Sequence, residues 1–222
     1  MIFVNFKTYQ QGTGDNAVNL AKICGEVEKE SGIQIIPLVQ TTDIFRLASQ
    51  GLTVWAQHVD SISFGANTGK ILPEALIAAG AKGTLLNHSE NKLSMETIGS
   101  ILKKVKSLTI NHQSSFKVLV CCASVEEGQQ IVSFKPDFLA YEPPELIGGE
   151  ISVSQSKPEI IKEFVNQIRD VPILVGAGIH QSQDVQKTLE LGAKGILVSS
   201  DVVLSENPKQ ELLNLAGGFK LS

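Results

Sequence analysis

The chain has 222 residues, of which 42% are hydrophobic and 19% are charged, and its formal net charge is −4 at pH 7. The length lies in the range of one closed α/β barrel, and the apolar fraction is sufficient for a substantial core. The acidic charge argues against broad electrostatic attraction to nucleic acid or to an anionic membrane, so we expect neither as a partner.

The chain starts directly in a short apolar run, without the basic region or small-residue cleavage pattern of a secretion signal. No stretch reaches the ~18 consecutive apolar residues that a membrane span requires. The three cysteines, Cys24, Cys121 and Cys122, lack metal-ligand spacing, and their odd number suits free thiols in a reducing cytosol. The sequence therefore predicts a cytoplasmic protein with no metal and no other cofactor.

Short β-rich apolar runs alternate eight times with longer amphipathic stretches, without a linker between them. The predicted strands span residues 2–6, 34–38, 53–57, 83–87, 117–121, 138–141, 172–175 and 195–199. The predicted helices span residues 16–30, 44–49, 73–79, 95–105, 125–133, 158–168, 184–191 and 209–215. Nearly continuous apolar character is typical of parallel strands that are covered on both faces.

The predicted helices have recognisable ends. Ser124 and Ser182 are N-cap candidates, and Pro73 and Pro158 fall in first turns. Glycines stand just past four of the predicted C-termini, at Gly32, Gly51, Gly80 and Gly192.

Eight βα units can close into a barrel or remain an open, doubly wound sheet, and the pattern alone does not decide. A dinucleotide-binding open sheet should carry Gly-x-Gly-x-x-Gly after its first strand, but Lys-Thr-Tyr-Gln-Gln follows here at residues 7–11. We therefore predict an α/β fold in which residues 1–222 form a single (β/α)8 barrel domain.

Reactive residues of such barrels lie at the C-terminal ends of the strands. Asn5 and Lys7 end the first strand two residues apart, so both would face one side, which is costly unless they meet a ligand or each other. For this pair taken alone, we favour a solvated lysine beside a capping asparagine. His88 and Glu90 follow the fourth strand, where a neutral imidazole could donate to a carbonyl and Glu90 could orient Lys7. A histidine that caps the next helix is the alternative.

Glu142 leaves the sixth strand and enters a segment that begins with two prolines and ends with Gly148 and Gly149. A rigid start and a permissive end suit a hinged lid, whose closure would expel water from around the carboxylate. A Pro-Pro turn with an exposed glutamate is the competing interpretation.

Small residues follow the seventh and eighth strands, namely the Gly-Ala-Gly run that ends at Gly178, and Ser199 with Ser200. Their backbone N–H groups can approach an anion, and a short helix after Ser200 would add the positive end of its dipole. Phosphate commonly binds at this place in such barrels. Together the strand ends indicate metal-free proton transfer next to the carbonyl of a small phosphate ester.

At these residues the chain resembles the triosephosphate isomerase family, and particularly its short archaeal form. The motifs that carry the resemblance are Val-Asn-Phe-Lys-Thr-Tyr at 4–9, Ala-Gln-His-Val-Asp at 56–60, Gly-Thr-Leu-Leu-Asn-His-Ser-Glu-Asn at 83–91, Glu-Pro-Pro-Glu-Leu-Ile-Gly at 142–148, Gly-Ala-Gly-Ile at 176–179 and Ser-Ser at 199–200. In this order and spacing they cover nearly the whole chain.

The resemblance implies interconversion of glyceraldehyde 3-phosphate and dihydroxyacetone phosphate through an enediolate. It makes Glu142 the base and His88 the neutral electrophile, with Lys7 facing the enediolate and Asn5 beside it. Glu90, which could orient Lys7 or the reacting oxygens, completes the predicted catalytic set. The positions that it implies for substrate binding are Asn5, Phe6, Lys7, Ile147, Gly148, Gly178, Ser199 and Ser200. It also implies a homodimer or homotetramer, in which the loop at 65–69 reaches a neighbouring subunit.

Two positions depart from the family pattern. The lid of the family usually ends Ile-Gly-Thr-Gly, whereas this chain has Gly149 and Glu150 in the last two places. Asp201 stands where the archaeal pattern usually has glycine, and a carboxylate there would repel a phosphate unless it points away. These departures favour one alternative, a non-catalytic sugar-phosphate binder or assembly protein. The generic Gly-Ala-Gly and Ser-Ser turns alone would also suit another enzyme on a related phosphate-binding barrel.

Overall fold

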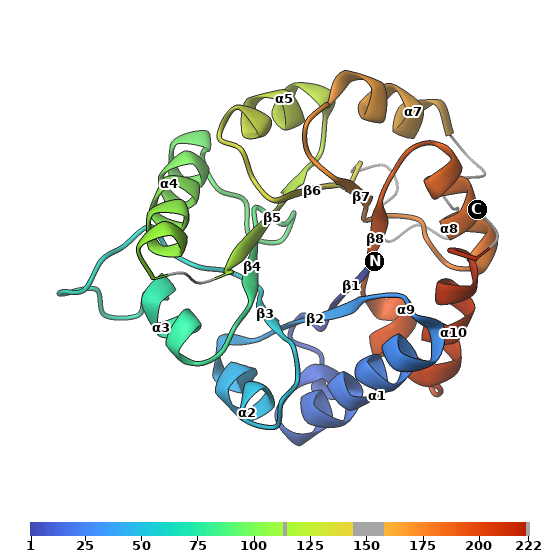
Figure 1. Ribbon diagram of the computed structural model, residues 1–222, viewed down its shortest axis with the longest axis horizontal. Helices are drawn as coiled ribbons and strands as arrows, with labels where there is room; N and C mark the ends of the chain where they lie inside the picture. Colours follow the sequence, from blue (N-terminus) through green and yellow to red (C-terminus); the bar gives the residue numbers. More distant parts are fainter. Residues whose placement is uncertain (113–114, 144–157, 221–222) are drawn as a thin grey trace.

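The computed structural model describes residues 1–112, 115–143 and 158–220. Its parallel strands β1 to β8 hydrogen-bond in chain order, and β8 pairs with β1, so the sheet is a closed barrel. The helices form a ring around this barrel (Figure 1). The predicted (β/α)8 fold is confirmed.

The observed elements follow the predicted alternation closely. The strands are β1 Ile2–Asn5, β2 Ile35–Val39, β3 Trp55–Ala56, β4 Gly83–Leu86, β5 Lys117–Cys122, β6 Phe138–Tyr141, β7 Ile173–Val175 and β8 Gly195–Val198. The helices are α1 Asp15–Ser31, α2 Ile44–Ala48, α3 Pro73–Ala78, α4 Met95–His112, α5 Val125–Ser133, α7 Pro158–Gln167, α8 Ser182–Glu190, α9 Ser200–Val203 and α10 Pro208–Gly217, with 3-10 turns η1 Gln10–Gly12 and η2 Thr41–Asp43.

Two predicted boundaries were wrong by more than the usual fraying of element ends. Helix α4 continues seven residues beyond the predicted end at residue 105, because residues 106–112 contain neither glycine nor proline. Strand β3 contains only two of the five predicted residues. The side chain of Gln57 takes the place of the missing ladder, since its amide donates to the backbone oxygens of Lys7 and Leu38.

The helix ends test the capping predictions. Ser124 caps α5, because its hydroxyl accepts a hydrogen bond from the N–H of Glu127. Ser182 does not cap α8, since it is the first helical residue and Gln181 precedes it in an extended conformation as the N-cap. Asp184 closes a capping box with Gln181 there, a reciprocal pairing that a search for a lone serine misses.

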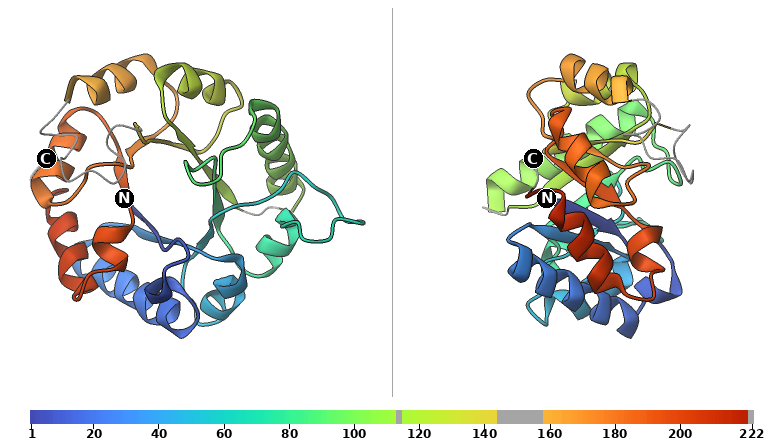
Figure 2. Two further views of the ribbon diagram at one scale, coloured as in Figure 1. Left: turned by 180° about the vertical axis from the view of Figure 1, so that it is seen from behind. Right: turned by 90° about the vertical axis from the view of Figure 1, so that its right-hand side faces the viewer.

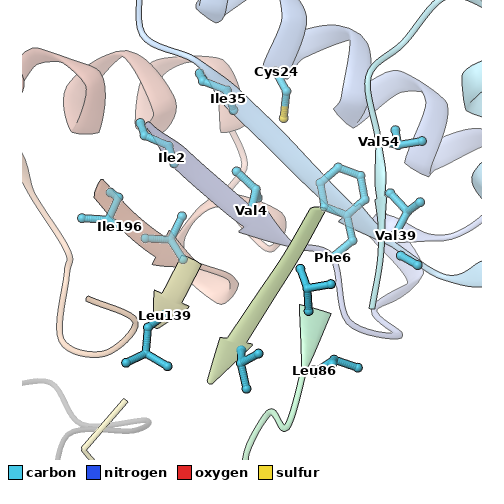
Figure 3. Close-up of a cluster of buried hydrophobic side chains, with 14 of the residues drawn as sticks. Ile2, Val4, Phe6, Cys24, Ile35, Val39, Val54, Leu86, Leu139 and Ile196 are labelled. Carbon is cyan, nitrogen blue, oxygen red and sulfur yellow. The ribbon is translucent and has the colours of Figure 1, made fainter. Parts of the chain in front are cut away.

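The barrel wall separates two apolar layers because successive strand residues point to opposite sides. Ile2 and Val4 of β1 pack outward under the helices, in the cluster drawn in Figure 3, whereas Phe3 points into the barrel. The barrel interior is filled by an aromatic cluster in which the Phe3 ring lies 5.0 Å from Trp55 and 5.8 Å from Phe138, both edge to face. Apolar rings thus plug the barrel below the ends of the strands.

The segment between β3 and α3 projects away from the barrel, as both the front view and the view from behind show (Figures 1 and 2). Phe64 in this segment is 78% exposed. None of the helices in the described ranges combines the length and the apolar character needed to cross a bilayer.

The aromatic cluster predicts a strict requirement for glycine at residue 83. A Cβ added there would lie 2.5 Å from Cδ2 of Trp55 and 2.6 Å from the carbonyl oxygen of Lys117. We expect Gly83→Ala to lower the free energy of unfolding by about 1 to 3 kcal/mol, because the ring and the strand must move apart. Urea unfolding followed by tryptophan fluorescence measures this change.

Gly25→Ala in α1 is the matched control, because a Cβ at Gly25 meets no atom within 4 Å. We expect it to raise the free energy of unfolding by about 0.5 to 1 kcal/mol, since alanine loses less backbone entropy than glycine in a helix. Equal effects of the two substitutions would contradict the predicted contact between residue 83 and Trp55.

Candidate active site

A chain of polar contacts joins the ends of β1, β4 and β6 at one end of the barrel. Lys7 Nζ donates to Oε1 of Glu90 at 2.7 Å, and the other oxygen of Glu90 lies 3.7 Å from Nδ1 of His88. On the far side of the imidazole, Nε2 lies 3.6 Å from Oε1 of Glu142. The structure therefore brings together four of the side chains that the sequence singled out.

Lys7 is aimed by a strained backbone that its neighbours hold in place. Its φ is +46°, a left-handed conformation that costs energy for a residue other than glycine. The buried side chain of Asn5 accepts a hydrogen bond from the N–H of Lys7 at 3.0 Å, and Gln57 donates to its carbonyl oxygen at 2.9 Å. Asn5 and Lys7 are thus in direct contact. Gln57 supports them, a role that we did not predict from the sequence.

His88 is positioned by the turn before it. Asn87 has φ +58°, and its buried amide donates to the carbonyl oxygen of Cys121 on β5 and to the carboxylate of Glu127 on α5, both at 2.8 Å. The amide oxygen of Asn87 accepts from the N–H of Leu93 at 2.9 Å. These bonds fix the direction in which the chain leaves β4, and so the direction of the histidine. Asn87 and Glu127 were not recognised from the sequence.

One hydrogen bond assigns the tautomer of His88. The backbone N–H of Glu90 donates to Nδ1 at 3.2 Å, so Nδ1 acts as an acceptor and carries no proton. In the neutral ring the proton then lies on Nε2, the nitrogen that faces Glu142. His88 therefore presents a neutral N–H donor to the end of the barrel beside the carboxylate.

Glu142 is a buried carboxyl group, with 6% of its surface exposed. Burial raises its pKa, and the nearby charge of Glu90 adds to this effect, whereas His88, the Cys121 thiol and Lys7 act in the opposite direction. Its Oε2 atom has no hydrogen-bond partner in the part of the chain that the structure describes. Such a carboxylate is more basic than one in water, and it has an oxygen that is not committed to another group.

The absence of a side chain at Gly176 gives Glu142 its place. A Cβ there would come within 2.6 Å of Cγ of Glu142. The backbone N–H of Gly176 also donates to the carbonyl oxygen of Tyr141 at 2.9 Å, and Glu142 donates in the same way to Cys122. The glycine after β7 therefore lets the carboxylate turn over the end of the barrel.

The residues expected to bind phosphate lie at the ends of β7 and β8. Gly178 has φ +65°, Ser199 precedes α9 and donates from its hydroxyl to the carbonyl oxygen of Asn5 at 2.7 Å, and Ser200 begins α9. The Phe6 side chain is fully buried in the layer between barrel and helices (Figure 3). The expected contacts at Ile147 and Gly148, and the altered lid end at 149–150, lie outside the described residues.

Asp201 does not repeat the glycine of the family pattern, and its carboxylate has a partner. Oδ2 of Asp201 is hydrogen-bonded to Nδ1 of His180, which follows β7. We predicted no role for His180 from the sequence, because it lies 21 residues from Asp201 and a lone histidine after a strand has no distinctive pattern. Within residues 1–112, 115–143 and 158–220, no group of three or more His, Cys, Asp or Glu side chains could hold a metal ion.

A polarising N–H donor beside a basic buried carboxylate, with a lysine close by, is suited to removing a proton next to a carbonyl group. The donor would stabilise the negative charge that appears on the carbonyl oxygen when the proton leaves. The lysine would add a positive charge to the same region. The geometry therefore supports enolisation chemistry.

Comparison with known proteins agrees with this chemistry. The family model described as triosephosphate isomerase matches residues 1–216. The chain is 42% identical over 214 residues to the triosephosphate isomerase of Saccharolobus solfataricus, and the alignment covers 95% of this chain and 92% of that protein. It is 41% identical over 221 residues to that of Methanothermus fervidus, covering 97% and 96%. For that of Methanobacterium bryantii the identity is 40% over 220 residues, covering 97% and 95%.

These relatives are matched along nearly their full length, so the barrel and the order of the motifs are shared with them as one unit. The chain belongs to the triosephosphate isomerase family, and it is an intramolecular isomerase that interconverts glyceraldehyde 3-phosphate and dihydroxyacetone phosphate.

Proposed function

We propose that Glu142 and His88 divide the proton transfers of the isomerisation between them. Starting from dihydroxyacetone phosphate, the Glu142 carboxylate removes a proton from C1, and the electron pair moves into the C1–C2 bond as the carbonyl becomes an oxyanion. His88 donates from Nε2 to that oxygen, accepts the hydroxyl proton of O1 in turn, and Glu142 returns its proton to C2. The product is the aldehyde, and no metal or cofactor takes part.

The single observation that supports this proposal is the hydrogen bond from the N–H of Glu90 to Nδ1 of His88. It leaves Nε2 as the donor, and Nε2 is the ring nitrogen that lies 3.6 Å from Glu142. A protonated imidazole would place two donors, Nδ1–H and the Glu90 N–H, against each other, so the neutral form is favoured. The donor and the base therefore face the same space.

Lys7 supplies the positive charge near the developing oxyanion, and Glu90 holds the ammonium group by the 2.7 Å ion pair. Asn5 acts through the backbone of Lys7, which its side chain fixes in the left-handed conformation. The fully buried Phe6 side chain can support the site only from behind, so a substrate contact there would come from its backbone.

The phosphate of the substrate is held by backbone N–H groups at Gly178, Ser199 and Ser200, together with Ile147 and Gly148 of the segment after β6. The positive φ of Gly178 and the small side chains of the two serines leave the backbone accessible. The ends of β7 and β8 lie side by side in the barrel because these strands pair directly. An anion there lies across the end of the barrel from His88, which follows β4, and beside the end of β1, which pairs with β8 and leads to Lys7.

The chain works as a single domain over residues 1–222 and in the cytoplasm. The closed barrel supports the first statement, because each strand depends on two neighbours for its hydrogen bonds and β8 closes onto β1. The three buried, unpaired cysteines support the second, since free thiols suit a reducing compartment. One cooperative transition in the unfolding experiment above would be expected of a single domain.

Glu142→Gln tests the base directly. We expect kcat for glyceraldehyde 3-phosphate to fall by about 10²- to 10⁴-fold with little change in KM, because a general base is lost while substrate contacts remain. His88→Gln should lower kcat by about 10²-fold, because an amide is a poorer proton relay. Rates in both directions are measured with purified protein whose fold is verified by circular dichroism.

Glu159→Gln, on the exposed side of α7, is the matched control and should leave both constants unchanged. A folded wild-type protein without turnover above background would overturn the assignment, and so would an active Glu142→Gln variant.

The burial of Glu142 also predicts a pH-dependent cost in stability. Its pKa in the folded state is raised above the ordinary value of 4.5, so the folded state binds more protons than the unfolded state between these two pKa values. The wild-type protein should lose stability as pH rises through that window, and Glu142→Gln should not. The free energy gained by Glu142→Gln should therefore grow from pH 4 to pH 8, as measured by urea unfolding at each pH.

Removal of an exposed carboxylate should not give a stability gain that grows with pH, and Glu159→Gln again serves as the comparison. A constant difference between Glu142→Gln and the wild type across the pH range would show that the carboxyl group is not held in a desolvated site.

The chain also assembles into a homodimer or homotetramer through the segment between β3 and α3. This segment projects from the barrel (Figures 1 and 2), and it contains Phe64, which is 78% exposed and stands between Ser63 and Gly65. An exposed aromatic ring in a projecting loop is typical of a residue that enters a pocket of a partner. The partner is a second copy of the chain.

Phe64→Asp should shift the protein toward the monomer, because burying a carboxylate in an apolar contact is costly. Phe45→Asp, also at an exposed phenylalanine but in α2, is the matched control and should leave the mass unchanged. Sedimentation equilibrium reports the mass of both variants. A monomeric wild-type protein at micromolar concentration would contradict the proposal.

A further inference from the structure

His180 and Asp201 form a hydrogen-bonded pair that joins the segments following β7 and β8. Nδ1 of His180 is hydrogen-bonded to Oδ2 of Asp201, and about one third of each side chain is exposed. The catalytic proposal uses neither residue. The pair nevertheless joins the two segments to which that proposal assigns the phosphate.

Asp201 occupies a position where a carboxylate is unfavourable for the substrate. It follows Ser200 directly and lies in the first turn of α9. Its side chain could fold back toward the N–H groups of Ser199 and Ser200, because carboxylates are attracted to free backbone N–H groups at such turns. These are the groups assigned to the phosphate, so Asp201 would compete for them and would also repel a dianion.

In the structure Oδ2 of this carboxylate is turned toward His180, and Oδ1 accepts from the side-chain hydroxyl of Ser200 at 3.4 Å rather than from a backbone N–H group. The backbone of His180 is fixed, because its N–H donates to the buried carboxylate of Asp184 at 3.1 Å, and the N–H of Gln181 donates to the same oxygen at 3.2 Å. Nε2 of His180 has no hydrogen-bond partner among the described residues. The ring is thus held at its backbone by α8 and is committed through Nδ1 to Asp201.

Glu211 on α10 is a second carboxyl group near Asp201. Burial raises the pKa of Glu211, and the charge of Asp201 raises it further, whereas Asn214 and His180 act in the opposite direction. Asp201 is therefore close enough to Glu211 for the two carboxylates to repel each other. Without His180 the carboxylate would keep the hydroxyl of Ser200 as a partner, and repulsion from Glu211 would turn it toward the backbone N–H groups of the serine turn.

We propose that His180 is a positioning residue for substrate binding: its hydrogen bond to Oδ2 holds the Asp201 carboxylate away from the backbone N–H groups at the phosphate position. This inference rests on the proposed phosphate position at Gly178, Ser199 and Ser200. It predicts that His180 and Asp201 are coupled. Asp201 is harmful to phosphate binding only when His180 is missing.

The test is a double-mutant cycle with His180→Ala, Asp201→Gly and both together. Three quantities are measured: kcat and KM for glyceraldehyde 3-phosphate, the inhibition constant of inorganic phosphate, and kcat/KM for D-glyceraldehyde, which lacks the phosphate. His180→Ala should raise KM and the phosphate inhibition constant by about tenfold, the effect of one unbalanced charge at close range. It should leave kcat and the D-glyceraldehyde reaction nearly unchanged.

Asp201→Gly alone should bind phosphate at least as well as the wild type, and the double variant should return to within about twofold of the wild type. This rescue separates a positioning role from general damage, which a second substitution would not repair. Glu206→Gln, an exposed charge removal further along the same segment, is the control and should rescue nothing. If His180→Ala is unstable, His180→Gln should show the same direction with a smaller effect.

The outcomes separate the inference from the proposal beneath it. If inorganic phosphate competes with substrate in the wild type but its inhibition constant is unchanged in His180→Ala, the role of His180 is overturned and the phosphate position stands. An equal loss with D-glyceraldehyde, or a failure of Asp201→Gly to rescue, overturns the role as well. If inorganic phosphate does not compete in the wild type, both the phosphate position and the inference fall.

Discussion

The active end of this barrel is organised around one carboxyl group kept out of water. Burying a charged carboxylate is unfavourable unless charges or donors offset the lost hydration, and Glu142 receives only partial compensation. His88 offers a neutral N–H rather than a cation, because its other nitrogen already accepts from the Glu90 backbone. Glu142 is therefore a stronger base than an exposed glutamate.

The barrel makes this arrangement structurally possible. Aromatic rings fill the interior below the strand ends, so the carboxylate lies above a dry, packed floor rather than over a water-filled channel. Gly176 leaves space for the side chain where any Cβ would collide with it. Parallel closure brings β1, β4 and β6 to the same end, so residues more than fifty positions apart can act on one small substrate.

The fold could be predicted from the sequence, and the residues proposed to react could be singled out, because both follow from local patterns. Eight apolar runs with intervening amphipathic stretches specify the barrel, and Glu142 and His88 each stand directly after such a run. The supporting residues are different, since their roles depend on partners distant in the chain. Gln57 bonds to a carbonyl 50 residues away and Asn87 to a carboxylate 40 residues away, and neither contact leaves a local pattern.

The acidic side chains around this end of the barrel show how the charge of the site is controlled. Glu90 is paired with Lys7, Glu127 with Lys92, and Asp201 with His180. Each of these acids is thereby held in a fixed direction by a partner in direct contact, and the two lysines also balance the charge of theirs. Glu142 differs from them among the described residues in facing an imidazole whose hydrogen bonding favours the neutral form.

This difference has a functional consequence. A phosphate dianion approaching an end of the barrel with four unbalanced carboxylates would be repelled, whereas pairing three of them leaves the charge of the base as the main local cost. A cation in direct contact with Glu142 would lower the pKa of its carboxyl group and make it a weaker base. The distribution of lysine and histidine partners therefore separates two requirements, the attraction of an anionic substrate and the basicity of the group that deprotonates it.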